Sequence, residues 1–87
     1  MKQLLDKVAY VTGAAGGIGR ALALAFAAEG ARIAVVDQKA EAVNAVAEQI
    51  KAAGGVALPL VVDVTDATGV PDSIARVHAA LGAVDIL

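Results

Sequence analysis

The amino-acid sequence predicts an α/β fold in three layers, with helices on both faces of a parallel sheet. In its 87 residues, short runs rich in β-branched residues alternate with longer segments of helical periodicity. The short runs are apolar, as expected of strands that are buried on both faces. Strand–helix–strand repeats imply right-handed crossovers and therefore parallel strands. We expect a single domain over residues 1–87, with a sheet of about four strands in the order 3-2-1-4 and three helices.

Four segments are expected to be strands, and the first three are followed by a glycine or an aspartate. Gly13, Asp37 and Asp63 occupy these positions. An apolar run bounded by such a residue is typical of a strand that gives way to a loop. The expected strands are residues 8–12, 33–36, 56–62 and 84–87.

Three segments between the strands carry apolar residues at spacings of three and four, which indicates helices with one buried face. The expected helices are residues 17–28, residues 40–53, and a third that starts at 66 or 67 and ends at 81. Glycines follow all three and can end them. The expected buried residues are Ile18, Leu22, Ala25 and Phe26 in the first helix, Val43, Val46, Ala47 and Ile50 in the second, and Val70, Ile74, Val77 and Leu81 in the third.

The start of the third helix is the least sharply marked boundary. Thr65 or Asp66 can cap its free amides, and Pro71 fits if it lies within the first turn. Gly69 weakens that turn. The expected start therefore spans a few residues.

Composition excludes several classes of function. The formal net charge is −2 and no basic run is present, so we expect no nucleic-acid partner. There is no cysteine, and a single histidine, His78, cannot build a metal site alone. Residues 1–7 are too short and too charged for a signal peptide, and no apolar run approaches the roughly 18 residues of a membrane span. We therefore expect a cytoplasmic protein that does not enter membranes.

A glycine-rich turn follows the first expected strand. The strand ends at Thr12, and the next helix begins at about Gly17. This arrangement aims the free amides of the helix, and roughly half a positive charge, past the end of the strand, where a pyrophosphate fits without a lysine. Gly13 permits the sharp turn, Gly17 lets the backbone approach the phosphates, and Gly19 brings helix and strand together. The pattern predicts a dinucleotide site.

Three other interpretations apply to a glycine-rich turn. It can be a turn with no ligand. A P-loop requires Gly-Lys-Ser/Thr where the helix begins, whereas this chain has Gly19-Arg20-Ala21. A methyltransferase-type glycine loop also precedes an acidic residue at the end of the second strand, and it stays open as an alternative that the spacing of Gly13, Gly17 and Gly19 fits poorly.

Asp37, 24 residues after Gly13, is expected to set the cofactor preference. At the end of the second strand, a carboxylate can accept hydrogen bonds from both adenosine ribose hydroxyls, and it would repel the 2′-phosphate of NADP. Such a mismatch costs about 1–3 kcal/mol, which favours NAD. The alternative is a solvated loop carboxylate. Arg20 and Arg32 are the basic residues that could bind a 2′-phosphate, although Arg32 is expected to be solvated at the start of the second strand.

The segment Thr12-Gly13-x-x-x-Gly17-Ile18-Gly19 resembles the T-G-x-x-x-G-I-G signature of the short-chain dehydrogenase/reductase family. The resemblance covers the whole chain, and it implies a Rossmann-like fold with NAD(H) as the ligand. It implies that the glycine-rich turn faces the pyrophosphate and the adenosine ribose, and that Asp63 and Val64 hold the adenine. The expected cofactor-binding residues are Gly13, Ala15, Gly16, Gly17, Ile18, Gly19, Asp37, Gln38, Asp63 and Val64.

No catalytic residue is expected in these 87 residues. The resembled family transfers hydride with a Tyr-x-x-x-Lys pair on a later helix, where the tyrosine is the general acid or base. The sole tyrosine, Tyr10, lies in the first expected strand and is followed four residues later by Ala14. We expect Tyr10 to be a core residue with its hydroxyl satisfied locally, Ser73 to have a surface or cap-like role, and His78 to lie at the edge of a buried stripe.

The family would continue past Leu87 into an Asn-Asn-Ala-Gly turn beside the nicotinamide. We therefore expect the cofactor-binding portion of a longer oxidoreductase, with a partial, truncated domain. The alternative is a catalytically inactive, self-associating structural fragment. In either case an apolar sheet edge is expected to be exposed and to favour homo-oligomers.

Overall fold

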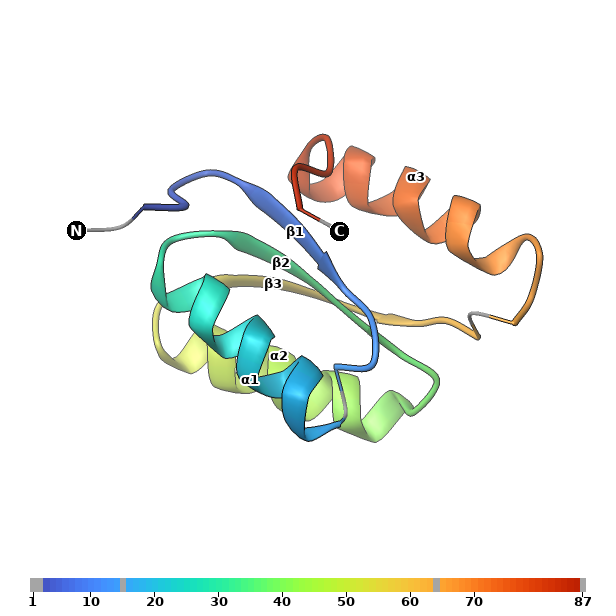
Figure 1. Ribbon diagram of the computed structural model, residues 1–87, viewed down its shortest axis with the longest axis horizontal. Helices are drawn as coiled ribbons and strands as arrows, with labels where there is room; N and C mark the ends of the chain where they lie inside the picture. The colour runs from blue at the N-terminus through green and yellow to red at the C-terminus, as the bar shows by residue number, and fades with distance from the viewer. Residues whose placement is uncertain (1–2, 15, 64, 87) are drawn as a thin grey trace.

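The computed structural model describes residues 3–14, 16–63 and 65–86. Its elements alternate strictly between strand and helix along the chain: β1 (Val8–Val11), α1 (Gly17–Ala28), β2 (Arg32–Asp37), α2 (Ala40–Ala52), β3 (Val56–Val61) and α3 (Gly69–Leu81). Helices α1 and α2 cover one face of the sheet and α3 covers the other (Figure 1). The three-layer α/β fold expected from the sequence is confirmed.

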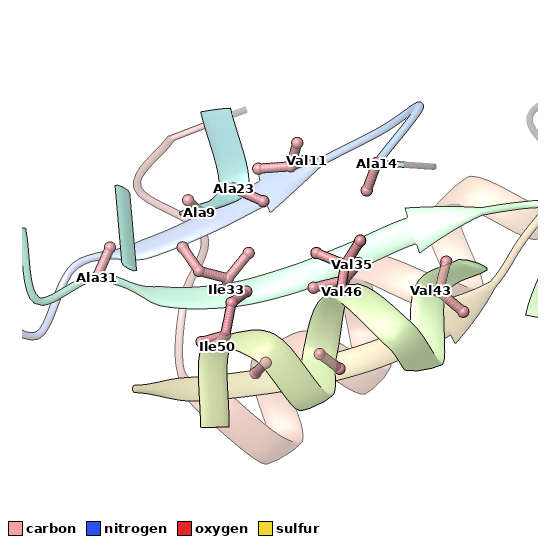
Figure 2. Close-up of a cluster of buried hydrophobic side chains, with 12 residues drawn as sticks. Ala9, Val11, Ala14, Ala23, Ala31, Ile33, Val35, Val43, Val46 and Ile50 are labelled. Carbon is pink, nitrogen blue, oxygen red and sulfur yellow. The ribbon is translucent and has the colours of Figure 1, made fainter. Parts of the chain in front are cut away.

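Each face of the sheet carries its own apolar cluster. The cluster under α1 and α2 joins Ile33 and Val35 of β2 to Val43, Val46 and Ile50 of α2, all of them buried (Figure 2). The cluster under α3 is formed by the strand residues whose side chains point to the other face, among them Val8, Tyr10 and Val36. They pack against Val77 and Leu81 of α3. Both faces of each strand are thus covered, which is why the strands are apolar without alternation.

The sheet has three parallel strands in the order β1-β2-β3 among the described residues. The expected fourth strand and the order 3-2-1-4 are not confirmed. Ile86 does lie parallel to the outer edge of β1, where it forms an isolated bridge with Ala9 and accepts a 2.8 Å hydrogen bond from the Tyr10 N–H. Next to it, the carboxylate of Asp85 accepts from the Val8 N–H at 2.9 Å. The Asp85 and Ile86 N–H groups both donate to the Val8 carbonyl, so these two residues line the outer edge of β1 without forming a full strand among the described residues.

Helix α1 buries the face expected from the sequence only in part: Phe26 packs against the core cluster as predicted, whereas Ala25 is exposed. Ile18 is 81% exposed and Leu22 is 45% exposed, so the prediction that they face the core is wrong. Ala23 is the fully buried residue of α1, and Ala27 packs against the same cluster. These residues follow Gly19 at intervals of four, and together they form a strip of small residues along the helix. The strip lets α1 lie close to the sheet, and the partly buried Leu24 and Phe26 also pack against this cluster, while Ile18 and Leu22 point outward.

Helix α3 begins later than expected. Its N-cap is Thr68 and its first residue is Gly69, so the predicted caps at Thr65 and Asp66 are wrong. The Asp66 carboxylate instead accepts from the N–H and the hydroxyl of Thr68, at 3.0 and 3.1 Å. This local turn uses the side chain that would otherwise cap the helix. Pro71 does lie in the first turn, as predicted.

Pro59 lies in the middle of β3, at the opposite edge of the sheet from β1. The Val62 N–H donates to the Asp37 carbonyl at 3.0 Å. Because the backbone of a strand alternates with a period of two, residues 58 and 60 also face β2, while residue 59 faces outward. Pro59 has no N–H to offer a further strand. Pro59 therefore makes this edge of the sheet less able to pair with a further strand.

Replacing Pro59 with threonine should make the chain self-associate more strongly. The substitution restores an outward N–H in a segment whose Val56 and Val61 side chains are already exposed. One added hydrogen bond corresponds to an association constant about threefold to tenfold higher. Size-exclusion chromatography with light scattering over a range of concentrations measures it. Val61→Thr is the matched control, because it adds a hydroxyl on the same edge without a new backbone donor. Equal association of Pro59→Thr and the unsubstituted chain would contradict the prediction.

Candidate functional site: a glycine-rich turn at the carboxyl edge of the sheet

The carboxyl ends of the three strands meet at one edge of the sheet. The Ala14 N–H, just after β1, donates to the Val36 carbonyl at 3.1 Å. The Asp37 carbonyl in turn accepts from the Val62 N–H, just after β3. The turn after β1 therefore lies beside the end of β2, which lies beside the end of β3. This arrangement brings Gly13, Asp37 and Asp63 to the same edge, as expected for parallel strands.

The glycine-rich turn requires glycine at two positions for different reasons. Gly13 has a φ of +63°, a left-handed conformation that side chains disfavour. At Gly19, a Cβ would lie 2.7 Å from the Gly13 carbonyl carbon and 3.1 Å from the Ala14 Cα, and nearer still to the Gly13 carbonyl oxygen. Helix α1 thus contacts the backbone of the turn directly. The roles predicted for these two glycines in the turn and in packing are in accord with this geometry.

The fold places no such demand on Gly17, the first residue of α1. A Cβ at this position would meet nothing within 4 Å. The N-cap, Gly16, makes no side-chain cap, and no acidic residue stands in the first turn of α1. The backbone amides that open a helix have no partner within it, and the space beside Gly17 at this helix start is open. The start of α1 can accordingly receive an anionic group.

Asp37 is half-buried at the end of β2 and accepts a 3.2 Å hydrogen bond from the Lys39 N–H. This bond turns the backbone from β2 into α2. Gln38, the next predicted site residue, is exposed between them. The carboxylate therefore lies at the edge shared with the glycine-rich turn.

The two arginines that could bind a 2′-phosphate are engaged elsewhere. Arg20 of α1 donates from Nε and Nη2 to the Gln49 Oε1 of α2, at 3.1 and 2.8 Å. Arg32 begins β2 at the opposite edge of the sheet, where it donates to the Leu81 carbonyl at 3.1 Å and pairs with Asp6 at 3.4 Å. Arg32 lies at the start of β2 as expected and its side chain is 42% exposed, and it is also held by these two contacts. A hollow of about 370 Å³ beside it is lined by Gly30, Gly54 and their neighbours, and lies away from the carboxyl edge.

Asp63 follows β3 and is held in a turn by Thr65, a residue that sequence reasoning did not single out for this site. The Asp63 Oδ1 accepts from the Thr65 hydroxyl at 2.6 Å and from the Thr65 N–H at 2.9 Å. Both bonds stabilise the charged carboxylate and lower the pKa of Asp63 below its ordinary value. The bond from the Thr65 hydroxyl has the larger effect, and the bond from the Thr65 N–H has the smaller one. Asp63 is thus an ionised hydrogen-bond acceptor at neutral pH. The Asp-x-Thr spacing is the signal that could have revealed this turn.

The remaining predicted residues differ in outcome. Ala15 and Val64 lie outside the described residues. Tyr10 is buried as predicted, but the partner of its hydroxyl is distant in sequence, since its oxygen lies 2.6 Å from the Ser73 Oγ. Ser73 is only 2% exposed, so its predicted surface role is wrong. His78 is exposed on α3 rather than at the edge of the buried stripe.

The described part of the chain comprises residues 3–14, 16–63 and 65–86. Within these ranges, no three His, Asp or Glu side chains come together as metal ligands would. The described helices also include none with the length and apolar character needed to span a bilayer.

A family model described as short chain dehydrogenase matches residues 7–87. The chain therefore belongs to the short chain dehydrogenase family, a family of oxidoreductases, and its three-layer sheet is the Rossmann-like fold of that family. D-threitol dehydrogenase of Mycolicibacterium smegmatis is 48% identical over 85 residues, which are 98% of this chain and 33% of that relative.

Solved structures agree with this assignment. Hydroxysteroid dehydrogenase from Escherichia coli matches with a TM-score of 0.93 and 38% identity, over 97% of this chain and 36% of that one. A metagenomic short-chain oxidoreductase in complex with NADP matches with a TM-score of 0.91 and 37% identity, over 97% of this chain and 38% of that one. The chain thus spans about a third of the length of these relatives.

Proposed function

We propose that this chain is the NAD(H)-binding portion of a short-chain dehydrogenase/reductase-like oxidoreductase. The observation that carries the proposal is the open start of α1 at Gly17, where the fold alone does not require glycine. A pyrophosphate placed there would accept hydrogen bonds from the amides of the first turn, and the helix dipole would favour its charge. The nicotinamide of the bound cofactor supplies the hydride-transfer chemistry. We assign no catalytic group to the described residues.

The other predicted site residues support the same ligand. Gly16 and Ile18 stand on either side of Gly17 at the start of α1, and Ile18 is 81% exposed, a position that an apolar ring of a ligand could cover. Asp63 would accept a hydrogen bond from the amino group of adenine. The proposed site therefore extends along the carboxyl edge from the glycine-rich turn to the end of β3.

We infer a preference for NAD over NADP from the carboxylate of Asp37. A structural neighbour is in complex with NADP, so the inference rests on the side chains at this site and not on the fold. In this chain Arg20 is hydrogen-bonded to Gln49, and Arg32 lies at the far edge of the sheet. The negative charge of Asp37 is therefore expected to dominate the electrostatics at a ribose 2′-phosphate.

Replacing Asp37 with serine should lower the NADH-over-NADPH affinity ratio by roughly tenfold to a hundredfold. The substitution removes the acceptor for the ribose hydroxyls and the charge that repels a 2′-phosphate, a difference of about 1–3 kcal/mol. Fluorescence titrations of the chain with NADH and with NADPH give the ratio directly. We expect micromolar to millimolar dissociation constants, on the order of those of weak cofactor sites.

Glu41→Gln is the matched control for this experiment. Glu41 is exposed in the first turn of α2, and its substitution removes one negative charge near the same edge without altering Asp37. We expect the cofactor ratio of this variant to stay near that of the unsubstituted chain. If Asp37→Ser leaves the ratio unchanged, the NAD assignment fails. If neither dinucleotide binds to the unsubstituted chain, the proposed function fails as a whole.

A second candidate function is a self-associating structural domain without a working site. The outer edge of β1 favours it, because Asp85 and Ile86 take only the Val8 N–H, the Val8 carbonyl and the Tyr10 N–H, and the described residues form no full strand along that edge. The homo-oligomer expected from the sequence stays a prediction, as does the cytoplasmic location. Light scattering on the unsubstituted chain tests the candidate: a monomer at every concentration contradicts it, and saturable NADH binding favours the cofactor site.

A further inference from the structure

A buried chain of hydrogen bonds joins β1 to the first turn of α3. The Tyr10 hydroxyl lies 2.6 Å from the Ser73 Oγ, and this oxygen lies 2.7 Å from the Val70 carbonyl. The single hydroxyl proton of Ser73 is used on Val70, so the phenol of Tyr10 must be the donor to Ser73. Both hydroxyl side chains are almost completely buried. The sheet thereby holds the start of α3 through directional bonds as well as apolar packing.

The start of α3 contacts the backbone of Asp63. A Cβ added to Gly69 would lie 3.1 Å from the Asp63 carbonyl oxygen and 3.4 Å from a methyl group of Val62. The Gly69 N–H also donates to the Asp66 carbonyl at 3.1 Å, and the Asp66 N–H donates to the Asp63 carbonyl at 3.0 Å. A shift of the first turn of α3 would therefore also move the Asp63 carbonyl group, against which Gly69 packs. The position of Asp63 depends on the position of α3.

We propose that Tyr10 and Ser73 are positioning residues for adenine recognition. They hold the first turn of α3, which holds Asp63 where its carboxylate can accept a hydrogen bond from the adenine 6-amino group. The inference rests on the proposed NAD(H) site and adds a buried pair that touches no part of the cofactor. It assigns the sole tyrosine of the chain a role in binding through α3 and none in proton transfer.

The test compares two reduced dinucleotides that differ only in the purine. Nicotinamide hypoxanthine dinucleotide has a carbonyl oxygen in place of the adenine 6-amino group, so it cannot donate to Asp63. The ratio of its dissociation constant to that of NADH therefore measures the adenine contact. We expect Tyr10→Phe, which removes one buried hydroxyl, to lower this ratio about threefold to tenfold, the equivalent of one hydrogen bond. Ser73→Ala should lower it similarly, and Asp63→Asn should abolish the preference.

Ile50→Val is the control for a purely structural effect. Ile50 is buried in α2 on the opposite face of the sheet, so its loss of a methylene lowers stability without contact with α3. We expect this variant to keep the purine preference even where its thermal midpoint falls as far as that of Tyr10→Phe. An unchanged preference in both Tyr10→Phe and Ser73→Ala, with NADH still bound, would overturn this inference alone. Absence of NADH binding to the unsubstituted chain would instead overturn the proposed function, and the inference with it.

Discussion

Gly19→Ala is expected to lower the free energy of unfolding by about 3 kcal/mol or more, at the upper end of what overpacking costs. The added Cβ would press on the carbonyl group of Gly13 and lie 3.1 Å from the Ala14 Cα. These neighbours are backbone atoms of a tight turn, and Ala14 is itself fully buried and bonded to Val36. A flexible side chain could swing aside, but this turn cannot. Urea denaturation followed by circular dichroism measures the loss.

Gly17→Ala is the matched control, because it adds the same methyl group two residues earlier in the same helix. The methyl group meets nothing within 4 Å, and alanine restricts the unfolded chain more than glycine does. We expect this variant to be as stable as the unsubstituted chain, or more stable by up to about 1 kcal/mol. A Gly19→Ala variant that unfolds at the same urea concentration as Gly17→Ala would show that α1 can move away from the turn.

The fold was predictable from the sequence wherever side-chain size and burial agree. The apolar positions of α2 at Val43, Val46 and Ile50 are the buried ones, because these large residues must be removed from water and the helix has a single apolar face. In α1 the same reasoning chose Ile18 and Leu22, which are exposed. Close approach, imposed by the contact of Gly19 with the turn, selects small residues for the inner face. The spacing of apolar residues along the sequence gives no information about this contact.

A tertiary hydrogen bond accounts for the burial of Ser73, which the sequence did not predict. Serine is most often exposed, yet Ser73 is buried because the Tyr10 hydroxyl, 63 residues away, meets it where α3 packs on the sheet. The fourth strand is not confirmed: among the described residues Ile86 forms an isolated bridge with Ala9, and the Asp85 carboxylate takes the Val8 N–H. Neither pairing has a local signature. The common location of Gly13, Asp37 and Asp63 was easier to predict, because the carboxyl ends of parallel strands lie at the same edge of a sheet.

Gly17→Val is expected to weaken NADH binding by at least about tenfold while leaving the fold intact. Valine is no worse than glycine within a helix, and the position is open in the protein, so the side chain would occupy only the space proposed for the pyrophosphate. Displacing a charged group from the amides of α1 costs roughly as much as overpacking a well-filled site, about 1–3 kcal/mol. NADH fluorescence titration measures the affinity, and urea denaturation checks the fold.

Ala25→Val separates this effect from a general response to a bulkier α1. Ala25 is exposed on the same helix, two turns from Gly17, so its substitution adds two methyl groups without approaching the glycine-rich turn. Unimpaired binding in Ala25→Val, together with lost binding in a folded Gly17→Val, would locate the dinucleotide at the start of α1. If Gly17→Val binds NADH as tightly as Ala25→Val, the amides of α1 do not hold the pyrophosphate, because a ligand in contact with them could not accommodate the added side chain.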